Sequence, residues 1–121
     1  FNEKDNCNFI KNVIKRSNEE FNYLYKLLEM YEDDETVNNV VIVTHTIPDI
    51  TFSEQGVYES HVCQYNTLFK GLKSTKLSKW IFGHTHQSWN HNYNNIDFIC
   101  NPRGRPDDYN RKQYSTVEIN L

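Results

Sequence analysis

The sequence predicts an α/β domain in which short strands of one sheet alternate with amphipathic helices. The run Val40–Val43 has four β-branched residues without polar alternation, which is typical of a strand buried on both faces of a parallel sheet. A second short apolar run, Trp80–Phe82, follows later in the chain. Each run comes after a segment with helical periodicity, and this alternation indicates parallel strands that share one sheet.

The N-terminal part predicts two helices. Residues 1–16 carry an apolar pattern that suits a short helix. Ser17 and Glu20 then have the form of a capping box, which predicts that a second helix begins there and covers residues 17–32. Its apolar stripe consists of Phe21, Leu24, Leu27, Leu28 and Tyr31. The acidic run Glu32–Glu35 ends the pattern, and we interpret it as a solvated helix end or loop.

The middle of the chain predicts strand, loop, helix and strand in that order. The first strand follows the turn signal Asn38-Asn39 and ends at Thr44-His45, and Pro48 begins a loop that continues through residues 49–59. A helix is predicted over residues 60–73, and polar residues connect it to the second strand. Its apolar positions are Val62, Tyr65, Leu68, Phe69 and Leu72.

The C-terminal part predicts antiparallel structure. An alternating segment, 88–93, and an apolar segment, 96–100, flank the turn candidate Asn94-Asn95, and together they predict a β-hairpin. A loop rich in proline, glycine and arginine follows at 101–106. A closing strand is predicted near the C-terminus, formed by Tyr114, Thr116, Val117, Glu118 and Ile119.

Composition excludes several classes of protein. The net charge of -3 lacks the basic footprint of a nucleic-acid-binding protein. No apolar run is long enough for a transmembrane helix, and the start has neither the features of a signal peptide nor an initiator Met. Cys7, Cys63 and Cys100 include no C-x-x-C pair, so we expect small apolar roles in a reducing compartment. These features favour a cytoplasmic protein without membrane contact, cut from a longer chain.

Three histidines are the candidate chemical groups. His45 and His84 follow the two predicted strands, whose carboxyl ends meet at one edge of a parallel sheet, where α/β proteins bind ligands. His84 and His86 are two residues apart, so an extended backbone would direct both rings to one side. Imidazole is a common ligand for transition metals. We therefore predict a shared metal site. His61 and His91 are interpreted as surface residues.

The motifs Val-Ile-Val-Thr-His45 with Pro48, Gly83-His84-Thr85-His86 and Asn101-Pro102-Arg103-Gly104 resemble, in this order, the calcineurin-like metallophosphoesterases. The resemblance covers the chain from about Ser17 onward. It implies half of an α/β/β/α sandwich, in which helices flank a mixed β-sheet. It also implies hydrolysis of phosphate mono- or diesters at a centre of two divalent metal ions, which could be Mn, Fe, Zn or Mg.

The resemblance assigns roles to particular residues. It implies that His45 and His84 bind one metal ion and that His86 binds the other. Arg103 is a candidate for binding the phosphate of the substrate, with a role in the fold as the alternative. Gly83 would permit close approach of the backbone at the ligand turn.

The family's upstream motifs, D-x-H, G-D-x-x-D/N and G-N-H-D/E, do not occur in this sequence. They supply the bridging carboxylate, other ligands and the catalytic histidine, so residues 1–121 are expected to be a single partial domain, the C-terminal half. That half would be inactive alone and would require the N-terminal half as a partner. Because half a sandwich exposes apolar surface, we expect the isolated chain to be poorly soluble, domain-swapped or dimeric.

Two other interpretations stay open. The chain could be a non-catalytic relic of the fold that acts as a binding or scaffold module. Alternatively, His45, His84 and His86 could form a single-metal site within this chain, since three protein ligands and a water satisfy zinc. The sequence identifies neither the metal nor the substrate.

Overall fold

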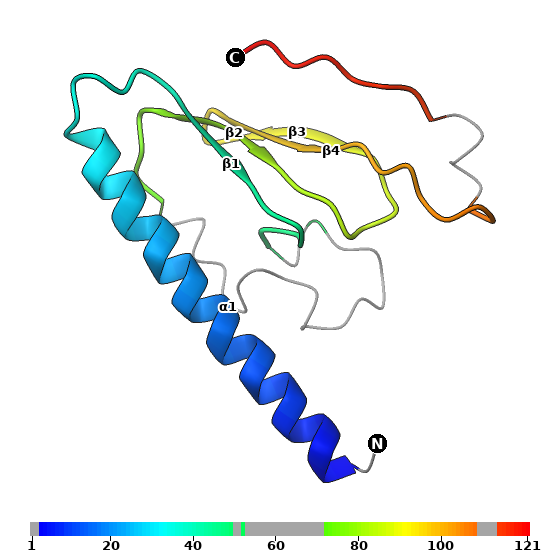
Figure 1. The fold of residues 1–121 in the computed structure, drawn as a ribbon. Helices are drawn as coiled ribbons and strands as arrows, with labels where there is room; N and C mark the ends of the chain where they lie inside the picture. The colour runs from blue at the N-terminus through cyan, green and yellow to red at the C-terminus, as the bar shows by residue number, and fades with distance from the viewer. Residues whose placement is uncertain (1–2, 50–51, 53–71, 109–113) are drawn as a thin grey trace.

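The computed structural model describes residues 3–49, 52, 72–108 and 114–121. It has one long helix, α1 (Glu3–Glu32), and four strands: β1 (Val40–Val43), β2 (Leu77–Ile81), β3 (Trp89–Tyr93) and β4 (Ile96–Cys100). The strands form one mixed sheet in the order β1-β2-β4-β3, and α1 lies to one side of it (Figure 1). The pairs β1–β2 and β2–β4 are parallel, and β3–β4 is antiparallel. The predicted α/β class, the parallel strands and the hairpin are therefore confirmed.

Helix α1 is continuous, so the prediction of two separate helices is wrong. Residues 1–32 contain neither glycine nor proline, and nothing in the sequence interrupts the helix at Ser17. Glu20 does not close a capping box; its carboxylate instead pairs with the side chain of Arg16 one turn earlier, at 2.9 Å. At about 1.5 Å per residue, the 30 residues span roughly 45 Å. The N-terminal half of α1 consequently extends past the sheet (Figure 1), and Phe9 is exposed there.

The end of α1 is joined to the segment that leads into β2. The Glu32 carboxylate accepts hydrogen bonds from the Thr75 amide at 2.9 Å and from the Ser74 hydroxyl at 2.9 Å. The hydrogen bond from the Thr75 hydroxyl is the main cause that holds the pKa of Glu32 below its usual value. Lys76 Nζ donates to the carbonyl oxygens of Tyr31 and Asp34 at 2.7 and 2.6 Å. The carbonyl of Tyr31 lies in the last turn of α1, where it has no partner within the helix, so this cation stabilises the helix end.

The hydrophobic core lies on the face of the sheet that α1 covers. Ile42, Trp80 and Phe98 are neighbours in register across β1, β2 and β4, and all three are buried. Phe98 stacks on Phe52 with ring centroids 4.8 Å apart. The other buried apolar residues of this cluster are Phe21, Leu28, Ile47, Leu77, Phe82, Ile96 and Cys100. An aromatic core thus fixes the sheet that carries the candidate histidines.

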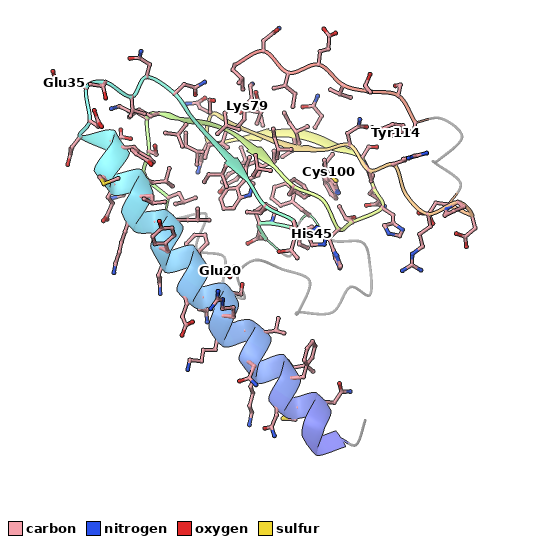
Figure 2. The ribbon with its side chains drawn as sticks, in the orientation of Figure 1. Glu20, Glu35, His45, Lys79, Cys100 and Tyr114 are labelled. Atoms are coloured by element: carbon pink, nitrogen blue, oxygen red, sulfur yellow. The ribbon has the colours of Figure 1, made fainter. Side chains whose placement is uncertain are left out.

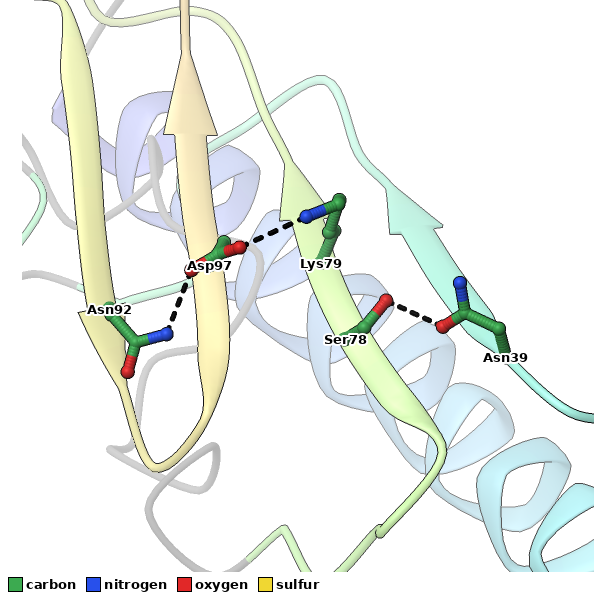
Figure 3. A network of polar contacts seen from close by, with 5 residues as sticks. All are labelled: Asn39, Ser78, Lys79, Asn92 and Asp97. Atoms are coloured by element: carbon green, nitrogen blue, oxygen red, sulfur yellow. Dashed lines mark hydrogen bonds and ion pairs between the residues drawn. The ribbon is translucent and has the colours of Figure 1, made fainter. Parts of the chain in front are cut away.

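The opposite face of the sheet carries both polar and apolar side chains. Lys79, Asp97 and Asn92 are neighbours in register, and the Asp97 carboxylate pairs with Lys79 Nζ at 3.0 Å and accepts from Asn92 Nδ2 at 2.8 Å (Figure 3). The bond from Asn92 and then that from Lys79 lower the pKa of Asp97. β1 is an edge strand of the described sheet, and Val43 is 71% exposed. The prediction that β1 is buried on both faces is therefore wrong.

The predicted hairpin is present in the structure, whereas the predicted C-terminal strand is not. Asn94 and Asn95 both have positive φ, of 51° and 62°, which is the backbone of a two-residue turn that matches the twist of a hairpin. Residues 114–121 form no strand, so the predicted closing strand is wrong. Val117 is 53% exposed, and a segment that buries so little apolar surface gains little to offset its ordering.

Several other predictions concern single segments. The helix predicted at 60–73 lies mostly outside the described residues, as do His61 and Cys63, and residues 72–73 are not helical. Cys100 is buried, which raises the pKa of its thiol to about 11, whereas Cys7 is exposed rather than a core residue. Within the described part of the chain, no helix has the length and apolar character needed to cross a membrane.

Candidate metal centre

The candidate site lies where β1 and β2 end. Val43 and Ile81 are partners in the parallel register, and the amide of Thr44 donates to the carbonyl of Ile81 at 3.0 Å. One step further, the amide of Gly83 donates to the carbonyl of His45 at 3.1 Å. The backbone pairing of the two strands therefore continues into the segments that carry His45 and His84.

Gly83 allows this close approach. A Cβ atom added at Gly83 would lie 3.2 Å from the carbonyl oxygen of His45, closer than an ordinary van der Waals contact. A larger residue would push the two segments apart and weaken the hydrogen bond between them. The expectation that Gly83 serves a close backbone approach is confirmed.

His84 sits at the centre of a tight turn. Its φ is +65°, and the amide of Thr85 donates to the carbonyl of Gly83 at 2.8 Å, across a single residue. A three-residue turn with positive φ is the rare, strained form of the γ-turn. The backbone is not extended here, so the expectation that His84 and His86 share one side does not apply. Their side chains have different partners.

His84 faces His45. Nδ1 of His84 lies 3.3 Å from Nε2 of His45, the ring centroids are 5.2 Å apart and the ring planes are inclined by 74°. Both residues are exposed, and Figure 2 shows His45 just beyond the end of β1. Two nitrogens bound to one ion at about 2.0–2.1 Å, at tetrahedral or octahedral angles, lie roughly 2.8–3.4 Å apart. The observed separation fits two ligands of a single metal ion.

His86 faces Asp108 instead. Its Nδ1 lies 2.8 Å from Oδ2 of Asp108, and both side chains are partly exposed. Arg103, in the loop between β4 and Asp108, is exposed. Among the described residues, no three His, Cys, Asp or Glu side chains converge on a position that could hold a metal ion. The described residues thus bring together two of the three predicted ligands and lend no support to a three-histidine site within this chain.

Thr44 fixes the segment that carries His45. The indole nitrogen of Trp80, which is fully buried, donates to Thr44 Oγ1 at 3.0 Å, and the Thr44 hydroxyl donates to the carbonyl of Thr46 at 2.9 Å. Thr44, the residue next to His45, is therefore hydrogen-bonded both to the core and to the turn that follows it. Neither Thr44 nor Asp108 is among the site residues expected from the sequence. For Thr44, the sequence signal is its position at the end of a strand, directly before a histidine.

Replacing Thr44 with valine is expected to lower the free energy of unfolding by about 1–3 kcal/mol. Valine has the shape of threonine but leaves the buried Trp80 N–H without an acceptor, and an unpaired buried donor costs about that much. Urea denaturation followed by tryptophan fluorescence measures the change. Thr116→Val is the matched control, because Thr116 is exposed. An equal effect in both variants would contradict this role for Thr44.

Comparison with known proteins returned no similar protein. No family model matches the sequence, and neither a curated protein nor a solved structure is significantly similar to the chain. The function of this chain is therefore inferred from its own residues and their geometry.

Proposed function

We propose that this chain supplies the C-terminal metal-ligand histidines of a calcineurin-like phosphoesterase, which hydrolyses phosphate mono- or diesters with two divalent metal ions. The observation that carries the proposal is the pairing of His45 Nε2 with His84 Nδ1, 3.3 Å apart. This pair lies at the carboxyl edge of two parallel strands, the edge at which α/β sheets bind ligands. The motifs that surround both histidines agree with the same family.

In this proposal His45 and His84 hold one ion, and His86 contributes a ligand to the second. When bound, the ions would polarise the phosphoryl group and neutralise the charge that develops on it. Arg103, exposed on the following loop, is proposed to bind phosphate oxygens. The backbone pairing at Gly83 and the bonds of Thr44 fix the backbone segments that carry the two imidazoles, so little backbone ordering remains to be done when an ion binds.

The remaining ligands, including a bridging carboxylate, are proposed to come from an N-terminal half that completes the sandwich. Two features of the described residues support such a partner. β1 is an edge strand with an exposed apolar residue, Val43, and exposed edges are templates for pairing with another strand. A groove of about 720 Å³ between α1 and the end of β1 is lined in part by Phe9, Val13 and Leu24, and it reaches His45.

The proposal is tested by metal-dependent hydrolysis of p-nitrophenyl phosphate, using the longest polypeptide that contains residues 1–121. Removal of metal with a chelator is expected to abolish activity, and addition of Mn²⁺ is expected to restore it. The same assay on the 121-residue chain should give no turnover, because its histidines lack the carboxylate ligands. A long polypeptide that stays inactive with Mn²⁺, Fe²⁺, Zn²⁺ and Mg²⁺ would contradict the proposal.

A second candidate function is a non-catalytic binding or scaffold module that retains the fold. The observation in its favour is that the described residues gather only two of the three histidines. It predicts weak metal retention and no turnover in any form of the protein. The presence of D-x-H and G-N-H-D/E motifs in the longer polypeptide would rule it out.

A further inference from the structure

The loop after β4 forms a short turn that holds the carboxylate of Asp108. Oδ2 of Asp108 accepts a hydrogen bond from the amide of Arg105 at 2.7 Å, and the amide of Asp108 donates to the carbonyl of Arg105 at 3.0 Å. These two bonds join the start and end of a short turn. They fix both the backbone of Asp108 and the direction of its side chain.

Gly104 provides the space for this carboxylate. Its φ is +75°, a conformation that favours glycine, and a Cβ atom built there would lie 2.7 Å from Oδ2 of Asp108. Any other residue at this position would displace the carboxylate oxygen. Gly104 is the glycine of the Asn-Pro-Arg-Gly motif, so the motif has a local physical role that the sequence did not reveal.

The same oxygen faces His86. Nδ1 of His86 lies 2.8 Å from Oδ2 of Asp108, so this oxygen lies within hydrogen-bond distance of two nitrogens, the His86 ring nitrogen and the Arg105 amide. An ionised carboxylate can only accept, so Nδ1 of His86 must carry the proton of this bond. In a neutral ring, Nε2 then carries the lone pair.

We infer that Asp108 is a positioning residue that holds His86 in the Nδ1–H tautomer and so presents Nε2 as the nitrogen available to a metal cation. The ligand role of His86 rests on the proposed function, whereas the tautomer rests only on the 2.8 Å contact of Nδ1 with an ionised carboxylate. Histidines that bind metals commonly donate their other ring N–H to a carboxylate, which orients the ring and makes the ligand nitrogen more basic. Asp108 is the group that would do this for His86.

The tautomer can be measured without any metal. Chemical shifts of ¹⁵N in a histidine-labelled 121-residue chain, recorded at a pH where the rings are neutral, distinguish Nδ1–H from Nε2–H. Wild-type His86 is expected in the Nδ1–H form, and Asp108→Ala should move it toward the Nε2–H form that free imidazole side chains prefer. Asp107→Ala removes the same charge from the neighbouring, exposed position and should leave the spectrum unchanged. The signals of His91 should be the same in all of these proteins.

A second variant and a second measurement keep the two proposals separable. Gly104→Ala retains the carboxylate but displaces it, and should also shift the tautomer of His86. Zn²⁺ titration of the longest polypeptide that contains residues 1–121 should then show a loss of affinity of about 10–100-fold in Asp108→Ala and none in Asp107→Ala. A wild-type His86 in the Nε2–H form would overturn the inference, whatever the metal data show. If His86 has the Nδ1–H tautomer but neither the 121-residue chain nor the longer polypeptide binds metal, the positioning role of Asp108 is supported. The proposed function is then overturned.

Discussion

Replacing His84 with asparagine is expected to lower the kcat/KM of metal-dependent phosphate ester hydrolysis on the order of 10³-fold in the longest polypeptide. The substitution removes one of the two nitrogens that lie 3.3 Å apart, and charge stabilisation by a metal ion is worth several kcal/mol. Asparagine tolerates positive φ, so the turn at φ +65° should persist. The initial rate of p-nitrophenyl phosphate hydrolysis in Mn²⁺ measures the effect.

His91→Asn is the matched control for this experiment. His91 is exposed on β3, away from the strand ends that carry His45 and His84, and its replacement should leave activity unchanged. Thermal unfolding of both variants checks that the fold is retained. Undiminished activity in the His84 variant would remove this residue from the metal ligands, even if the protein proved to be a phosphatase.

The substitution Phe98→Ala is expected to lower the free energy of unfolding by about 3–5 kcal/mol. Phe98 is fully buried at the centre of the sheet, where its ring stacks on Phe52 and lies 6.1 Å from the ring of Trp80. The truncation leaves a cavity beneath both rings. A small domain has only about 5–15 kcal/mol of stability, so the variant would lose a large part of it.

The measurement is urea denaturation of the 121-residue chain, followed by circular dichroism. Tyr23→Ala is the control, because it makes a similar truncation on α1 at a side chain that is 64% exposed, and its effect should stay within about 0.5 kcal/mol. If the two variants lost equal stability, the aromatic cluster around Phe98 would not be the main core of the domain.

The sequence predicts the presence of β1 to β4 because the signals for these strands are local. Four β-branched residues define β1, and the Asn94-Asn95 pair specifies the hairpin turn through two positive φ angles. The proximity of His45 and His84 follows from one topological rule, that parallel strands end at the same edge. None of these inferences needs side-chain packing.

Other features depend on contacts that the sequence does not display. The capping box at Ser17 is a local signal for the start of a helix. No helix starts there, because helical residues on both sides continue α1 through Ser17. The separation of His84 from His86 results from a turn that a hydrogen bond between Gly83 and His45 stabilises. The link between His86 and Asp108 joins two loops far apart in sequence, and neither loop alone contains its signal.

The positive φ of His84 lowers the stability of the fold at a position where the proposed function requires the imidazole. A residue other than glycine held in such a backbone conformation costs on the order of 1–3 kcal/mol, so the fold alone would favour glycine or asparagine there. Selection of variants for thermostability alone should therefore enrich substitutions at His84 that relax the turn and remove the imidazole. The most stable version of this domain would then be one that has lost its proposed ligand.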